Sequence, residues 1–159
     1  MTIDELLDRE AIKHLRQGYS AYLDAQDLDN LVDLFTEDAV CEYPEEYGGN
    51  WVGREAIRAN FAAIMPAIGE PFDAVHLVTN PWIRLTGPET ATGRWYLLDV
   101  LTRQKAGAGE MTTHGGHDNP LLWVGLYEDE YRKVDGDWKF SRTKLHTLWP
   151  ERAFDGLFT

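Results

Sequence analysis

Apolar residues that recur at steps of three and four predict amphipathic helices in the first part of the chain. This spacing runs from Asp4 to Leu23 and places the apolar side chains on one face of a long helix. A short helix is predicted to follow it, with Asp27 or Asp29 as the N-cap. A third helix is predicted from Arg54 to Met65, where the next residue is a proline that ends it.

Strand signals dominate the second part of the chain. A short strand is predicted over Ala39 to Tyr43, before the turn-rich stretch from Pro44 to Gly53. Four longer segments are rich in Val, Ile, Leu, Thr and aromatic residues: Phe72–Leu85, Thr90–Thr102, Leu121–Val134 and Asp137–Leu148. Asp135-Gly136 predicts a tight hairpin between the last two, because glycine accepts the positive φ that such a turn requires. Helices followed by long antiparallel strands predict an α+β fold, with one domain over residues 1–159.

Strand alternation places a histidine and an aspartate in apolar surroundings. His76, Asn80 and Trp82 are predicted to share one face of the first long strand. One face of the next strand carries Ala91, Gly93, Trp95, Leu97, Asp99 and Leu101. A buried carboxylate such as Asp99 is costly unless it is paired or protonated, and His76 is a partner if both faces line one cavity. The carboxylate would then hold one ring nitrogen of the histidine and leave the other as a proton acceptor.

Helical and neighbouring positions add further polar groups to this expected hollow. Tyr19 lies among apolar neighbours on the first helix, Asp24 lies at the end of that helix, and Tyr43 follows the short strand. Each of these residues, like His76, could also be ordinary core packing, because buried Tyr and satisfied buried His are common. The joint pattern of His76 and Asp99 on adjacent strands brings a catalytic site level with that alternative.

Composition and charge narrow the classes of partner. The chain has 159 residues and a formal net charge of −12, which argues against a nucleic-acid or anionic-membrane partner. Cys41 is the single cysteine, so neither an intramolecular disulfide nor a cysteine-rich zinc site is expected. No leader sequence or apolar run of membrane-spanning length is recognisable, which predicts a cytoplasmic protein.

Three stretches resemble the SnoaL-like branch of the nuclear-transport-factor-2-like superfamily. They read REAIKHLRQGYSAYLDAQDLDNLVDLF, HLVTNPWIRLTGPETATGRWYLLDVL and YEDEYRKVDGDWKF, and together they cover most of the chain in order. The resemblance implies a cone-shaped curved sheet that wraps around the N-terminal helix and encloses an apolar pocket. Within this branch, the sequence pattern resembles the bile-acid 7α-dehydratase type most, and scytalone dehydratase and lindane dehydrochlorinase more distantly. All are lyases that use no cofactor, so the resemblance implies neither cofactor nor metal here.

The resemblance also implies roles for four residues. His76 falls at the histidine that takes the substrate proton, and Asp24 at the helix-end aspartate that accompanies it. Tyr19 falls at an active-site tyrosine, and Asp99 at a strand aspartate of the bile-acid enzyme. Which of the two carboxylates pairs with His76 stays open. The expected substrate-binding residues are Tyr43, Trp82, Trp95, Trp123 and His146.

Two departures from the family pattern concern the last strand and one loop. The bile-acid enzyme has an arginine on its last strand where this chain reads TKLHTLW, with Thr147 at the aligned position. Arg142 and Lys144 have the opposite strand parity, so a contact to an anionic substrate is in doubt. His114 and His117 flank two glycines in the loop from 105 to 120, where a glycine-rich lid is favoured over a metal site.

These observations predict a cofactor-independent lyase for a hydrophobic, aromatic or polycyclic small molecule, in aromatic compound catabolism. His76 would act as general base, in a dehydration or in a retro-aldol, deformylating cleavage. An isomerase or polyketide-cyclase-like enzyme could use the same base and expel nothing. A non-catalytic ligand carrier of the same fold is the third possibility. Because the outer face of such a sheet tends to pack on another copy, a homodimer or homotrimer is expected.

Overall fold

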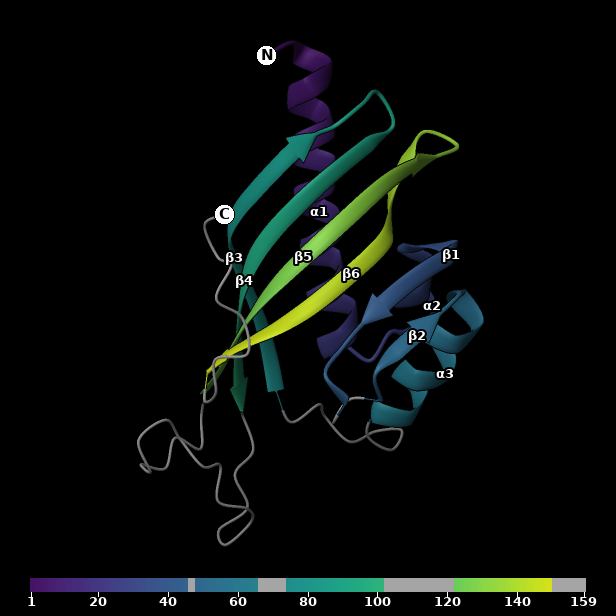
Figure 1. Cartoon of the computed structure of the whole chain (residues 1–159), viewed down its shortest axis with the longest axis vertical. Coiled ribbons are helices and arrows are strands. Elements are labelled where there is room, and N and C mark those ends of the chain that lie inside the picture. Colours follow the sequence, from purple (N-terminus) through teal and green to yellow (C-terminus); the bar gives the residue numbers. More distant parts are fainter. Residues whose placement is uncertain (46–47, 66–73, 102–121, 150–159) are drawn as a thin grey trace, which may run out of the picture.

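A curved, unclosed and mostly antiparallel sheet lies against the long N-terminal helix in the computed structural model (Figure 1). The structure describes residues 1–45, 48–65, 74–101 and 122–149. The helices are α1 (Ile3–Asp24), α2 (Leu28–Asp33) and α3 (Arg54–Ile64). The strands are β1 (Phe35–Glu42), β2 (Asn50–Val52), β3 (Ala74–Leu85), β4 (Thr90–Leu101), β5 (Leu122–Val134) and β6 (Asp137–Trp149). The predicted α+β class, the three helices and the four long strands are confirmed.

The sheet has the strand order β2-β1-β6-β5-β4-β3. Neighbouring strands are antiparallel except β1 and β6, which are parallel. α1 lies behind the sheet in Figure 1, while α2 and α3 lie beside β1 and β2. The core fills the space between α1 and the inner face of the sheet. Its fully buried aliphatic and aromatic members include Ile12, Leu31, Phe35, Ile57 and Phe140.

Local signals in the sequence explain where the first two helices begin. The Thr2 hydroxyl accepts a hydrogen bond from the Glu5 N–H, and the Glu5 carboxylate accepts one from the Thr2 N–H, which is a capping box. Asp27, rather than Asp29, caps α2 by accepting from the Asn30 N–H at 3.2 Å. The short strand β2 was not predicted, because it lies inside the turn-rich stretch and has only three residues.

The hairpin between β5 and β6 forms as its sequence predicts. Asp135 has φ 52° and Gly136 has φ 94°, so both central residues are in the left-handed region. Such a turn matches the right-handed twist of the flanking strands. It pairs Val134 with Asp137 and so fixes the register of the two longest strands.

A bulge in β3 overturns one prediction about the inner face. The pairing of β3 with β4 shifts between Thr79 and Trp82, and Asn80 has φ 53°. This extra residue reverses the alternation beyond it. His76 and Val78 therefore face α1, whereas Trp82 lies on the outer face and is 75% exposed. The expectation that Trp82 faces the hollow and contacts substrate is wrong.

Replacing Asn80 should reveal how much the bulge depends on this backbone conformation. Asn80→Val is expected to lower the free energy of unfolding by about 1–2 kcal/mol, because a β-branched residue is poorly tolerated in the left-handed region. Asn80→Gly should leave stability close to that of the wild type. Urea unfolding of the three proteins measures both effects. Equal stability of the valine and glycine variants would show that Asn80 does not hold a positive φ in solution.

Candidate active site

A cavity of about 280 Å³ opens between α1, α3 and the inner face of the sheet. Its polar groups are His76, Asp99 and three tyrosines, namely Tyr19, Tyr43 and Tyr127. Its apolar wall is formed by Leu23, Trp51, Phe61, Ile64, Leu97, Trp123 and Leu145. A concave, mostly apolar site with a few convergent polar groups is typical of small-molecule binding.

His76 is held at the cavity by the last residue of α1. Its Nδ1 lies 2.5 Å from Oδ1 of Asp24, and its backbone N–H donates to the same carboxylate at 3.1 and 3.3 Å. An ionised carboxylate can only accept, so Nδ1 carries the proton and Nε2 the lone pair when the ring is neutral. The Asp24 carboxylate thus fixes both the orientation and the tautomer of the imidazole.

Asp99 lies on the other side of the histidine ring. It is the cross-strand partner of His76, and its Oδ2 is 3.9 Å from Nε2. Its Oδ1 is buried and has no hydrogen-bond partner among the residues that the structure describes. Burial raises the pKa of Asp99; the charge of a protonated His76 opposes this rise, and the nearby Asp24 carboxylate adds to it. The pairing that the sequence left open is therefore resolved: Asp24 bonds the imidazole, and Asp99 faces it without a direct hydrogen bond.

Three phenols form the floor of the cavity. The hydroxyls of Tyr19 and Tyr43 lie 2.8 Å apart, and Tyr127 from β5 lies beside them. Burial raises the pKa of Tyr19 to about 12 and holds those of Tyr43 and Tyr127 well above the ordinary value. All three are neutral near pH 7, and a phenol O–H that is not used within this group can donate a hydrogen bond to an oxygen atom in the cavity.

The comparison with known protein families matches this architecture. The model of the SnoaL-like domain matches residues 4–144. The chain belongs to the SnoaL-like family. The predicted place of the chain in the nuclear-transport-factor-2-like superfamily is thereby confirmed.

Solved structures similar to this SnoaL-like protein include three that bear on its fold. The "Putative Scytalone Dehydratase" from Novosphingobium aromaticivorans is 27% identical, with a TM-score of 0.73 over 92% of this chain and 88% of that one. A hexachlorocyclohexane dehydrochlorinase from Novosphingobium barchaimii is 20% identical, with a TM-score of 0.68 over 99% and 97% of the two chains. A protein of unknown function with a cystatin-like fold from Nostoc punctiforme is 21% identical, with a TM-score of 0.69 over 89% and 91%.

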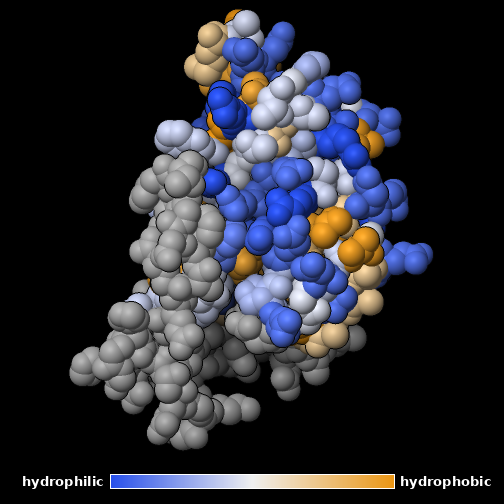
Figure 2. Space-filling model, viewed as in Figure 1, coloured by the Kyte–Doolittle hydropathy of each residue, from blue (hydrophilic) through white to orange (hydrophobic). Residues whose placement is uncertain are grey.

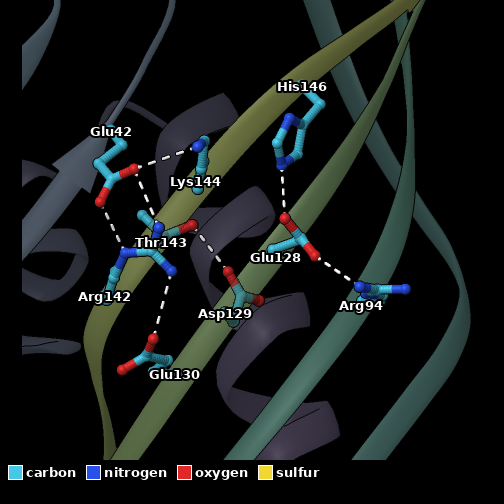
Figure 3. A network of polar contacts seen from close by, with 9 residues as sticks. All are labelled: Glu42, Arg94, Glu128, Asp129, Glu130, Arg142, Thr143, Lys144 and His146. Carbon is cyan, nitrogen blue, oxygen red and sulfur yellow. Dashed lines mark hydrogen bonds and ion pairs between the residues drawn. The ribbon is translucent and has the colours of Figure 1, made fainter. Parts of the chain in front are cut away.

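The SnoaL-like cavity receives some of the predicted substrate-binding residues and excludes others. Tyr43 and Trp123 line it as expected. Trp95 is on the inner face but lies outside the cavity lining, where it is buried and its Nε1 donates to the Tyr131 hydroxyl at 2.9 Å. His146 points to the outer face, where its Nε2 lies 2.6 Å from a Glu128 oxygen (Figure 3). The expectations that Trp95 and His146 line the pocket are wrong, since the first packs deeper in the core and the second has the opposite strand parity.

The outer face of the sheet carries charged pairs around a second hollow of about 340 Å³, whose lining includes Arg94, Glu128 and Arg142. Figure 2 shows this face, which is strongly hydrophilic across its centre. Arg142 pairs with Glu42 and Glu130 here, and Lys144 approaches Glu42 (Figure 3). The predicted parity of Arg142 and Lys144 is confirmed, so neither supplies the arginine that the bile-acid enzyme has on its last strand.

Sequence reasoning missed Tyr127 as a cavity residue. The signal was present, because Tyr127 alternates with Trp123 and Gly125 on one face of β5 and lies opposite Trp95. His114 and His117 lie outside the described residues. Within the described ranges, no group of three or more His, Cys, Asp or Glu side chains is arranged to hold a metal ion. No helix in those ranges combines the length and apolar character needed to span a membrane.

The raised pKa of Asp99 predicts a pH-dependent effect of its replacement. The folded protein keeps a proton on Asp99 that the unfolded chain releases, so stability is lost as the pH rises from the ordinary value of 3.8 through the folded value. Asp99→Asn, which cannot ionise, should therefore be more stable than the wild type at about pH 7 and gain nothing below pH 3.8. Urea unfolding across this range measures the difference. A gain of equal size at every pH would contradict the assignment.

Proposed function

We propose that this protein is a cofactor-independent lyase that removes a proton from a hydrophobic small molecule with His76 as general base. The observation that carries the proposal is the Asp24–His76 pair at the edge of an apolar cavity, with Nδ1 and Oδ1 2.5 Å apart. A pocket that only stores an apolar ligand needs no oriented imidazole between two carboxylates. The similarity to a structure named as a dehydratase, at 27% identity, supports the same class of reaction.

The proposed reaction begins with proton transfer to Nε2 of His76. The electron pair of the broken C–H or O–H bond moves into the substrate, and the imidazolium that forms is stabilised by the Asp24 carboxylate. In a dehydration, this pair forms a C=C bond as a C–O bond breaks and the hydroxyl leaves with a proton as water. In a retro-aldol cleavage, loss of the O–H proton forms a C=O bond as a C–C bond breaks; the electron pair of the C–C bond passes to the remaining carbonyl as an enolate, which takes back a proton from the imidazolium.

The floor of the cavity suits an oxygen that gains negative charge during this step. Tyr19 and Tyr43 share a hydrogen bond between their hydroxyls, so one phenol can donate onward into the cavity. Donors already in place at the position of developing charge lower the barrier, because they need no reorganisation during the reaction. Tyr19 therefore takes the role of hydrogen-bond donor to a carbonyl or leaving oxygen.

The volume and lining of the cavity restrict the substrate. A space of about 280 Å³ with Trp51, Phe61 and Trp123 in its wall fits a flat ligand of one or two rings. We therefore propose an aromatic compound that carries a carbonyl group and a β-hydroxyl or hydroxymethyl group.

Incubation with a panel of such hydroxylated aryl ketones, followed by mass spectrometry of the products, tests the proposal. Loss of water or of formaldehyde, absent in the Asp24→Asn/His76→Gln double variant, is the expected result. A product of unchanged mass would replace the lyase by an isomerase or cyclase that uses the same base. Tight binding of panel members with no turnover would favour a carrier.

A further inference from the structure

A fully buried ion pair lies directly behind the phenols of the cavity floor. Arg16 on α1 donates to both carboxylate oxygens of Asp129 on β5, with Nη2 at 2.5 Å from Oδ1 and Nε at 3.0 Å from Oδ2. Both side chains are 0% exposed. Nη2 of Arg16 also donates to the Thr143 hydroxyl, and the Tyr131 hydroxyl donates to Asp129. The pair is therefore held in one geometry.

The guanidinium group stacks on aromatic rings that belong to the cavity. Its central carbon lies 3.7 Å from the ring centre of Tyr127 and 4.6 Å from that of Tyr19. Both of these tyrosines also line the cavity. The positive charge of Arg16 thus lies against two of the phenol rings that line the cavity.

Packing alone does not account for a charged pair at this position. Buried ion pairs lose so much hydration that apolar side chains of similar volume often serve stability as well or better. Nη1 of Arg16 is buried and has no hydrogen-bond partner among the described residues, so its donors are not fully used. The neighbours Ile12 and Leu15 are apolar, as this face of the helix requires, and Arg16 interrupts the pattern.

We propose that Arg16 is a positioning residue whose buried charge strengthens the phenol floor as a donor to a substrate oxygen that becomes negative. This proposal rests on the proposed proton abstraction and deepens it. It assigns the substrate to compounds whose carbonyl becomes an enolate when His76 removes the neighbouring proton, because only such an oxygen gains a full charge at the floor.

Arg16 changes the pKa values of Tyr19 and Tyr127 in the direction that this role requires. Burial is the largest influence and raises the pKa of Tyr19, while the charge of Arg16 lowers it. The hydrogen bond between Tyr19 and Tyr43 lowers the pKa of Tyr19 further, and the nearby Cys41 thiol acts in the opposite direction. At Tyr127, Arg16 again lowers the pKa and Asp129 raises it. A lower phenol pKa makes a stronger hydrogen-bond donor, so removing Arg16 weakens the floor and removing the charge of Asp129 strengthens it.

The binding of two probes tests the proposal without turnover. 4-Nitrophenolate carries an oxyanion, and nitrobenzene has nearly the same shape without charge. The ratio of their dissociation constants is compared in the wild type, in Arg16→Met/Asp129→Asn and in Asp129→Asn. The double replacement removes both charges together, so no unpaired ion is left in the core. We expect nitrophenolate to bind about tenfold more weakly to the double variant, and several-fold more tightly to Asp129→Asn, with nitrobenzene unchanged in both.

Two further variants separate an electrostatic from a structural role. Arg16→Lys keeps the charge and should keep most of the nitrophenolate affinity. Arg142→Met/Glu42→Gln removes a similar pair from the outer face of the sheet and should change neither probe. Whichever of the double variant and Asp129→Asn stays folded carries the test, with Arg16→Lys as the variant that keeps the charge.

The proposal is overturned if the ratio of the nitrophenolate and nitrobenzene dissociation constants in Asp129→Asn or in the double variant equals that of the wild type. It is also overturned if nitrophenolate does not bind to the wild type. No step of this test uses His76. If the ratio changes with Arg16 but the protein has no lyase activity, the proposed effect of the Arg16 charge on anion binding stands and only the proposed function is wrong.

Discussion

His76→Gln is expected to slow turnover by about 10²–10⁴-fold while the protein keeps its fold. Glutamine fills much of the space of the imidazole and can still donate to Asp24, but it cannot accept a proton near pH 7. The loss should appear in kcat more than in KM, because the general base acts on the barrier and not on ground-state binding. Steady-state kinetics on a substrate found in the panel, together with circular dichroism of both proteins, measures the effect.

A second half-buried histidine supplies a matched comparison. His146 has the same side-chain exposure as His76, 10%, and likewise contacts a carboxylate, that of Glu128. It lies on the outer face of the sheet, away from the cavity. His146→Gln should retain turnover within about threefold of the wild type, because a substitution far from the site usually changes free energies by only about 0.5 kcal/mol. Near-full activity of His76→Gln would rule out the proposed base.

Arg16→Met alone is expected to lower the free energy of unfolding by about 3–5 kcal/mol. Methionine leaves the Asp129 carboxylate in the core without its cation, although Thr143 and Tyr131 still donate to it. The double variant Arg16→Met/Asp129→Asn should recover most of that loss, because the uncompensated charge is gone. Urea unfolding of the two single variants and the double variant gives the coupling between the residues directly.

An ion pair on the outer face provides the reference for this cycle. Arg142 is 30% exposed and pairs with Glu42 in a similar two-point geometry. Because water screens this pair, Arg142→Met should cost no more than about 1 kcal/mol. If Arg16→Met were no more costly than the double variant, the loss would arise from packing and not from the buried charge.

The long elements of the fold could be predicted because their signals are local. The apolar spacing of α1 and the Asp135-Gly136 turn each depend on neighbouring residues only, and both are confirmed. Trp82 was misplaced because one residue, Asn80, adopts a positive φ and reverses the alternation after it. Only the Asn80-Pro81 dipeptide signals this bulge in the sequence. The prediction assumed that side chains keep alternating between the two faces beyond Asn80, which they do not.

The site was predictable as far as strand alternation reaches. It placed His76 and Asp99 together on the inner face, where the structure pairs them across β3 and β4. The contact between His76 and Asp24 depends on where α1 ends relative to β3, which only the family resemblance indicated. Arg16 was overlooked, although a charged residue between Leu15 and Tyr19 on the apolar face of a helix was a visible irregularity.

The position of the proton on the His76 ring tests the account most directly. Nitrogen-15 spectra of histidine-labelled protein, with the His76 signals identified from the His76→Gln variant among the five histidines, report which ring nitrogen carries hydrogen. At a pH where the ring is neutral, we predict that Nδ1, bonded to Asp24, carries the hydrogen and that Nε2 carries none. A neutral ring with hydrogen on Nε2 and none on Nδ1 would contradict the proposed base.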